Sequence, residues 1–232
     1  MKKIGLIGGI GPESSIEYYR SIIRHFQEQL GTKDYPEITI HSINMTEMLA
    51  YVFNNQLEQL VSFLLDKLKI LELAGVDYAA IASNTPHIVF DKLAEKTAVP
   101  LISIVEETCK VVQQKNLKRV GLFGTKSTMT FGFYNRIAVK NGIEIIIPNS
   151  ENRDYIHNKY MGELIFNDIN LDTKQRLIEI AFELKEKESI QGLILGGTEL
   201  PLILKQSDFN DIELFDSTQI HVNSIVKRMI EG

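Results

Sequence analysis

The sequence of 232 residues contains no tryptophan and only one cysteine, Cys109. A single cysteine excludes a disulfide framework and a cysteine-rich metal site. No stretch approaches about 18 uninterrupted apolar residues, so no membrane-spanning helix is expected. The net charge is −5 and the Lys and Arg residues are not clustered, which argues against nucleic acid as a partner because phosphate binding needs clustered basic side chains. The five histidines show no H-E-x-x-H or comparable spacing, so we predict no metal.

The composition is that of an ordinary globular protein. Hydrophobic residues make up 44% of the chain and charged residues 24%, which excludes a disordered chain. The apolar start is short, broken by glycine, and meets Pro12 and Glu13. We therefore interpret it as a first β-strand rather than a signal peptide, and we expect a soluble, cytoplasmic protein with one large domain or two small ones.

Short apolar runs alternate with amphipathic stretches of helical length along the whole chain. The predicted strands are 3–8, 37–42, 78–82, 101–104, 119–123, 144–147, 192–195 and 213–215. The predicted helices include 13–29, 56–74, 85–96, 105–115, 128–141, 152–166, 173–187 and 217–229. Continuous apolar strands separated by helices predict an α/β fold with doubly wound parallel sheets that are covered on both faces.

An internal repeat divides the chain into two halves. A shift of 116 positions places 3–8 on 119–124, and a shift of 114 places 81–84 on 195–198. Two matches in the same order predict two similar α/β domains related by a pseudo-twofold. We expect residues 1–100 plus 215–232 to form the first domain and residues 101–214 to form the second.

The carboxyl ends of the predicted strands are rich in Gly, Ser, Thr and Asn. These loops are 8–14, 42–46, 83–87, 124–130 and 196–199. Ligands of open parallel sheets bind at this edge, and backbone N–H groups near helix starts suit a carboxylate or phosphate. We therefore expect a ligand cleft between the two halves.

Known nucleotide-binding motifs do not fit the first loop. The run Gly9-Ile10-Gly11-Pro12-Glu13-Ser14 lacks the third glycine of G-x-G-x-x-G, and the Walker A lysine is also absent. A tight turn with Pro12 at the first helical position accounts for the pattern. The pair Ser83 and His87 allows a hydrolase or lyase hypothesis, but no G-x-S-x-G turn accompanies it.

Read in order, five segments of the chain resemble the aspartate/glutamate racemase family. They are IGGIGPE at 7–13, SNTPH at 83–87, GT at 124–125 with TM at 128–129, IHNKYMGEL at 156–164 and GGTELP at 196–201. The resemblance implies two α/β domains with the substrate bound in the cleft between them, and neither pyridoxal phosphate nor a metal. It also implies a homodimer.

In the family, two cysteines flank the α-carbon of an amino acid; one thiolate removes the proton and the other thiol returns one to the opposite face. A thiol with a reference pKa of about 8.5 can be tuned to either role. The family motifs are Cys-Asn-Thr and Gly-Cys-Thr-Glu, but here Ser83 and Gly197 stand at the two cysteine positions and Cys109 matches neither. The two-thiol reaction therefore cannot run in this chain.

Three explanations remain open. A different acid/base pair could replace the thiols, with Ser83, His87 and Glu199 as the catalytic candidates beside the Gly197 position. The protein could instead have lost catalysis and act as a ligand-binding or regulatory protein. Artificial substitution at both cysteine positions is the third explanation.

The expected ligand is a small acidic amino acid or dicarboxylate, bound without a cofactor. We expect Lys159 to meet its distal carboxylate, although a solvated lysine on a helix fits the same pattern. Charge-assisted hydrogen bonds to the α-carboxylate are expected from the strand-end loops. The substrate-binding candidates are Gly11, Asn44, Met45, Asn84, Thr85, Thr125, Thr128, Lys159 and Thr198.

Overall fold

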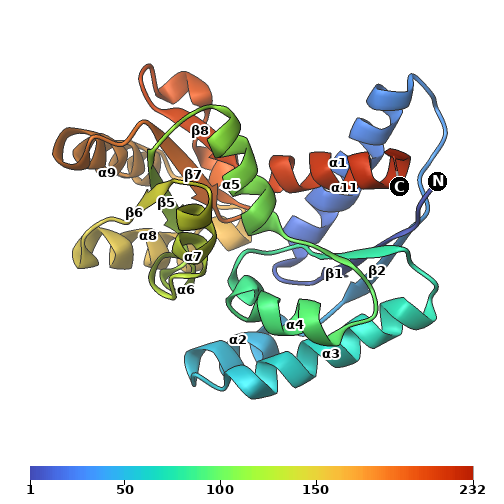
Figure 1. Ribbon diagram of the computed structural model, residues 1–232. Coiled ribbons are helices and arrows are strands. Elements are labelled where there is room, and N and C mark those ends of the chain that lie inside the picture. Colours follow the sequence, from blue (N-terminus) through green and yellow to red (C-terminus); the bar gives the residue numbers. More distant parts are fainter. Residues whose placement is uncertain (232) are drawn as a thin grey trace. The chain divides into compact units, whose positions relative to one another are not determined.

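The computed structural model describes residues 1–231 and divides into two compact units (Figure 1). The first unit contains Met1–Ile104 and the C-terminal segment that begins at His221, and the second contains Val105–Ile220. Each unit has one four-stranded parallel sheet. The predicted fold class of parallel α/β sheets with flanking helices is confirmed.

The two sheets share one strand order. The order is β2-β1-β3-β4 in the first unit and β6-β5-β7-β8 in the second, so in both the first strand of the unit lies next to the second and third. This equivalence is what the internal repeat predicted. The strands are β1 (Ile4–Gly8), β2 (Ile38–Ser42), β3 (Tyr78–Ile81), β4 (Leu101–Ile102), β5 (Arg119–Gly124), β6 (Glu144–Ile146), β7 (Gly192–Gly196) and β8 (Glu213–Asp216).

Helices cover both faces of the first sheet. On one face, Leu6 of β1 and Ala80 of β3 pack with residues of α1 (Pro12–Leu30) and of α11 (Ser217–Glu231). On the other face, their chain neighbours Ile7 and Ile81 pack with three further helices. These are α2 (Met45–Phe53), α3 (Leu57–Leu73) and α4 (Phe90–Lys96), the last preceded by the 3₁₀ helix η1 (Thr85–Val89). Because successive strand residues point to opposite faces, the continuous apolar runs fill two separate cores.

The second unit surrounds its sheet with shorter elements. The α-helices are α5 (Ile104–Gln114), α6 (Lys126–Thr130), α7 (Phe133–Lys140), α8 (Ser150–Gly162), α9 (Leu171–Glu188) and α10 (Leu200–Ile203). The 3₁₀ helices are η2 (Leu164–Phe166) and η3 (Gln206–Asp208). Both α6 and α8 contact β5, the central strand that pairs with β6 and β7.

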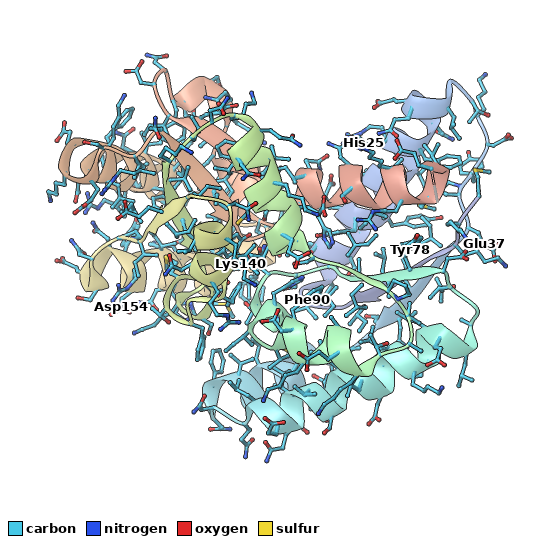
Figure 2. All side chains as sticks on the ribbon, viewed as in Figure 1. His25, Glu37, Tyr78, Phe90, Lys140 and Asp154 are labelled. Carbon is cyan, nitrogen blue, oxygen red and sulfur yellow. The ribbon has the colours of Figure 1, made fainter. Side chains whose placement is uncertain are left out.

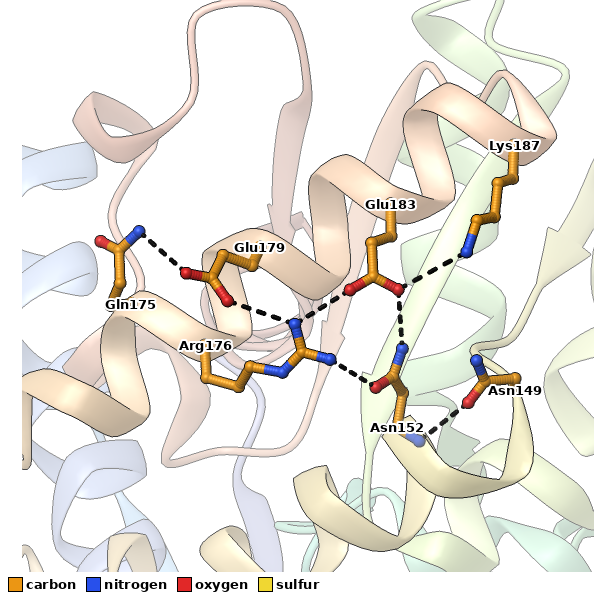
Figure 3. Close-up of polar contacts among 7 residues, drawn as sticks. All are labelled: Asn149, Asn152, Gln175, Arg176, Glu179, Glu183 and Lys187. Carbon is orange, nitrogen blue, oxygen red and sulfur yellow. Dashed lines mark hydrogen bonds and ion pairs between the residues drawn. The ribbon is translucent and has the colours of Figure 1, made fainter.

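A polar network joins α8 to α9 (Figure 3). Arg176 donates to Glu179 at 3.2 Å, to Glu183 at 2.9 Å and to the side-chain oxygen of Asn152 at 3.0 Å. The Asn152 amide group donates in turn to Glu183 at 3.1 Å, while the Asn149 side chain caps the start of α8 by accepting from the Asn152 backbone N–H. These contacts hold α8 against α9. Helix α8 carries Lys159 and Tyr160, which belong to the candidate site described below.

Several predicted elements differ in detail. The helix predicted over 128–141 is split into α6 and α7 because Gly132 adopts a left-handed conformation with φ of 72°. The helix predicted over 85–96 begins as a 3₁₀ turn. Helix α2 was missed altogether; its start is capped by the Asn44 side chain, which accepts from the backbone N–H groups of Thr46 and Glu47. A side-chain cap of this kind offsets the weak helical signal of so short a segment.

None of the helices within residues 1–231 combines the length and the apolar character that crossing a lipid bilayer requires.

The turn after β1 depends on Gly9. Its φ is +84°, and a Cβ at this position would lie 2.5 Å from the carbonyl oxygen of Ile43. We therefore predict that Gly9→Ala lowers the free energy of unfolding by about 3 kcal/mol or more, measured by urea denaturation, because backbone strain and a steric clash act together. The matched control is Gly31→Ala, since Gly31 also has a positive φ of 60° but no atom within 4 Å of the added carbon. Its cost is expected to be about 1 kcal/mol from strain alone. Equal losses in the two variants would contradict the steric part of the argument.

Candidate functional site

The loop after β1 meets the end of β3 in the first unit. The Ser15 hydroxyl accepts a hydrogen bond from the Gly9 backbone N–H at 2.7 Å, which closes the turn after β1. The Ser14 hydroxyl donates to the carbonyl oxygen of Ala82 at 2.9 Å. Gly11 lies directly before α1 as its N-cap, with Pro12 at the first helical position as the sequence predicted. The Gly11 loop is thereby held beside the residue that precedes Ser83.

Ser83, Asn84 and Thr85 form a buried polar segment after β3. Their exposed fractions are 9%, 3% and 6%. The Ser83 N–H donates to the carbonyl oxygen of Ile81 at 2.8 Å, and the His87 N–H donates to that of Asn84 at 3.0 Å. The segment is therefore a tightly wound turn that leads into η1.

His87 belongs to a buried aromatic cluster in the same unit. Its ring stacks on Phe90, which is labelled in Figure 2, at a centroid separation of 5.0 Å, and it meets His221 edge-on at 6.4 Å. Burial, with a smaller contribution from His221, lowers the pKa of His87 to about 3. His87 is consequently a neutral imidazole at physiological pH.

The hydrogen bonds of His87 and His221 fix which ring nitrogens carry protons. The Ile104 N–H donates to Nε2 of His87 at 3.3 Å, so this nitrogen is unprotonated and the proton of the neutral ring is on Nδ1. For His221, Nε2 donates to the carbonyl oxygen of Ile102 at 3.0 Å, and Nδ1 shares a hydrogen bond with the Tyr18 hydroxyl at 2.8 Å. His87 thus has no nitrogen available to take a proton from Ser83, which argues against the hydrolase or lyase hypothesis.

Asn44 and Met45 lie at the end of β2, where α2 begins. The Asn44 side-chain oxygen accepts from the N–H groups of Thr46 at 3.0 Å and Glu47 at 3.2 Å. Asn44 is exposed and Met45 half-buried. Capping of α2 accounts for Asn44 fully, and the predicted ligand contact of both residues stays a prediction.

In the second unit, the ends of β5 and β7 lie side by side. Gly124 pairs with Gly196 in the parallel register, so the loops that begin at Thr125 and Gly197 leave the sheet from neighbouring strands. The Thr125 hydroxyl accepts from the Thr128 N–H at 3.2 Å, and the two hydroxyl groups lie 3.1 Å apart. The candidates Thr125 and Thr128 are therefore in direct contact, in a half-buried and a buried position respectively.

Gly197, Thr198 and Glu199 follow β7 and meet α8. The Thr198 hydroxyl donates to a carboxylate oxygen of Glu199 at 2.6 Å, and the Tyr160 hydroxyl of α8 donates to the same oxygen. Glu199 is 3% exposed and Tyr160 6%. Burial, and secondly the Glu199 carboxylate, raise the pKa of the Tyr160 phenol well above its usual value. The carboxylate proposed as an acid or base is thus already an acceptor for two hydroxyl groups.

Lys159 is already paired within its own helix. Its ammonium group forms an ion pair and hydrogen bond with Glu163, whose other carboxylate oxygen accepts from the Thr173 hydroxyl at 2.6 Å. These contacts raise the pKa of Lys159 and lower that of Glu163. A ligand carboxylate would have to share this lysine with Glu163, so the predicted contact with a distal carboxylate gains no support.

Cys109 is completely buried in α5. Burial, together with the nearby Glu106 carboxylate, raises the pKa of its thiol to about 12. Because the thiolate is the reactive form of cysteine, the chain's one sulfhydryl group is inert at physiological pH.

Each of the two units is an α/β fold with one parallel sheet and polar loops at the carboxyl ends of its strands. The chain matches the Asp/Glu/Hydantoin racemase family over residues 7–225. It belongs to that family, which confirms the resemblance seen in the sequence.

The relatives that this chain matches include proteins named as racemases. It is 30% identical over 146 residues to the broad specificity amino-acid racemase RacX of Bacillus subtilis (strain 168), a match that covers 62% of this chain and 63% of RacX. It is 24% identical over 187 residues to a glutamate racemase of Limosilactobacillus reuteri (strain DSM 20016), covering 80% of this chain and 66% of that enzyme. The chain thus spans slightly less than two thirds of the length of these two relatives.

Solved structures agree with the family over nearly the whole chain. A putative Asp/Glu racemase from Yersinia pestis superposes with a TM-score of 0.91 at 30% identity, covering 99% of this chain and all of that one. An aspartate racemase homologue from Pyrococcus horikoshii gives a TM-score of 0.86 at 37% identity, covering 99% of both chains.

Sequence reasoning missed the role of α8 in the second unit. Its Tyr160 bonds to Glu199, and its His157 accepts from the backbone N–H of Lys126, next to Thr125, at 3.3 Å. The only sequence signal was the resemblance of 156–164 to the family, which drew attention to Lys159 rather than to its neighbour Tyr160.

The buried neutral His87 predicts a pH dependence of stability. His87 has a pKa of about 6.5 in the unfolded chain and about 3 in the folded one. As the pH falls from about 6.5 to about 3, the unfolded chain therefore binds a proton at His87 that the folded chain does not bind. This residue therefore removes at most about 1.4 kcal/mol of stability per pH unit on acidification through that window. We predict that His87→Gln makes urea-denaturation free energies, measured from pH 7 to pH 4.5, depend less steeply on pH. His25→Gln, a change at a half-buried histidine of the same unit, serves as the control, and an unchanged slope in His87→Gln would contradict the assignment.

Proposed function

We propose that this chain binds a small acidic amino acid or dicarboxylate through its strand-end loops and does not carry out two-thiol racemisation. The observation that carries the proposal is the absence of a usable sulfur. Ser83 and Gly197 stand where the family has its two cysteines, and the one thiol of the chain, on Cys109, is buried with its pKa raised to about 12.

The binding part of the proposal rests on the polar groups that the loops retain. Asn84 and Thr85 lie at the end of β3, Thr125 and Thr128 at the end of β5, and Thr198 at the end of β7. Amide and hydroxyl groups of this kind suit a carboxylate, because hydrogen bonds to an ionised acceptor are stronger than neutral ones. The names of RacX and of the L. reuteri glutamate racemase, which specify amino acids as substrates, support the same ligand class.

The groups that could replace the thiols are held in unsuitable states. A base that removes an α-proton works best with a pKa near the operating pH, whereas burial lowers the pKa of His87 to about 3. Glu199 is buried and its carboxylate already accepts hydrogen bonds from Tyr160 and Thr198, so a substrate proton would have to compete with two donors for it. A ligand-binding or regulatory role therefore fits this chain better than a substituted racemase.

The other expectations stay predictions. They are the ligand position, the homodimer and the absence of a cofactor, which the family resemblance implies, and the cytoplasmic location, which the composition and the apolar start indicated.

Binding and chemistry are tested on the wild-type protein. We expect calorimetry with the L and D forms of aspartate and glutamate, and with dicarboxylates, to detect binding of at least one. We expect no α-proton exchange with the bound amino acid in D₂O, followed by NMR. Binding by none of these ligands would refute the binding proposal, and exchange with inversion at the α-carbon would refute the claim that racemisation is lost.

Asn84→Asp is predicted to weaken binding by at least about tenfold. The change keeps the shape of the side chain but places a negative charge where the ligand carboxylate is proposed to bind. The control is Asn170→Asp, since Asn170 caps α9 by accepting from the N–H groups of Asp172 and Thr173 and aspartate performs the same task. We expect calorimetry to show wild-type affinity for this control. Equal affinities in the two variants would exclude Asn84 from the binding site.

A further inference from the structure

Gly197 lies directly against the ring of Tyr160. A Cβ built at position 197 would lie 3.0 Å from both Cζ and the hydroxyl oxygen of Tyr160, and closer still to Cε2. Real Cβ atoms essentially never approach another atom to less than 3.0 Å. Gly197 is not among the glycines with positive φ in residues 1–231, so its backbone conformation does not itself demand glycine. The lack of space for a Cβ is what requires glycine at this position.

Tyr160 cannot easily move out of the way. It is 6% exposed, so its ring is buried in the packing of the second unit. Its hydroxyl donates to Glu199, and Glu199 also accepts from Thr198 at 2.6 Å. Rotating the ring would leave a buried carboxylate short of one donor, which is costly. The packing of the ring and its hydrogen bond therefore keep the space over Gly197 closed.

We propose that Tyr160 takes the place of the family's second thiol in this chain. Its ring fills the room that any side chain at position 197 would need, and its hydroxyl, which comes from α8 and is bound to Glu199, stands beside the β7 loop instead. This inference rests on the proposed function, in which the chain lacks the family's thiol chemistry. It adds the residue that excludes a thiol from the loop after β7.

The replacement changes the chemistry that the loop can support. A cysteine needs its Cβ before it can place a sulfur, and that atom is the one Tyr160 excludes. The phenol that stands there keeps its proton, because burial and the Glu199 carboxylate raise its pKa well above the usual value. It can donate a hydrogen bond but cannot act as a base. Gly197 and Tyr160 are therefore paired in space, since the ring occupies the volume that a side chain at position 197 would need.

The pairing is tested by a double-mutant cycle in thermal unfolding. Gly197→Ala adds only the Cβ, and we expect it to lower the Tm of the otherwise wild-type protein by about 5 °C or more through overpacking. In a Tyr160→Leu background, which removes the ring, we expect the same change to cost less than about 2 °C. Tyr160→Phe is the matched control: it keeps the ring and removes the hydroxyl, so Gly197→Ala must remain as costly there as in the wild type.

The outcomes separate clearly. An equal cost of Gly197→Ala in the wild-type and Tyr160→Leu backgrounds would overturn the proposal, as would a small cost in the wild type. If Tyr160→Leu does not fold, Tyr160→Met replaces it, because the flexible methionine side chain adapts to an irregular space. The cycle needs no ligand, so it can fail while calorimetry still detects binding, and the reverse also holds.

Discussion

The parallel register of β5 and β7 sets Gly124 opposite Gly196, and neither position has room for a side chain. A Cβ at Gly124 would lie 2.7 Å from the carbonyl oxygen of Gly196, and one at Gly196 would lie 2.9 Å from that of Phe123. This close approach brings the starts of the Thr125 and Gly197 loops together at one edge of the sheet. The positions of the candidate threonines in the second unit follow from this close approach. Because the two glycines carry no side chains, the threonine hydroxyl groups of the two loops can lie close to their backbone.

Burial favours the neutral form of three titratable side chains, those of His87, Cys109 and Tyr160. It lowers the pKa of His87 to about 3 and raises those of Cys109 and Tyr160. In each case the neutral form is favoured, as expected when a group is removed from water without a partner of opposite charge. Active sites that transfer protons from carbon need the reverse, with pKa values brought close to the working pH. These three groups are therefore suited to packing and hydrogen bonding.

The sequence was sufficient for the fold because its main signals are local and periodic. Continuous apolar strands placed all eight strands within a residue or two, and the repeat anticipated that both sheets have one strand order. Helix α2 was not anticipated because its start depends on one asparagine cap. The contact between Tyr160 and Gly197 could not be foreseen either, since 37 positions separate the two residues and neither periodicity nor composition reports on such a distance.

Binding a carboxylate and racemising an amino acid make different demands on the same loops. Binding needs only oriented N–H and O–H groups, which a rigid turn supplies whatever the acidity of its side chains. Racemisation needs two groups on opposite faces of one carbon, each with a pKa matched to the transfer of a proton. Ser83 and Gly197 supply no thiol for the second of these demands, whereas the groups proposed to bind the carboxylate lie at other positions. Tyr160 also closes the space over Gly197, so restoring a thiol at this loop would need a change at Tyr160 as well as at position 197.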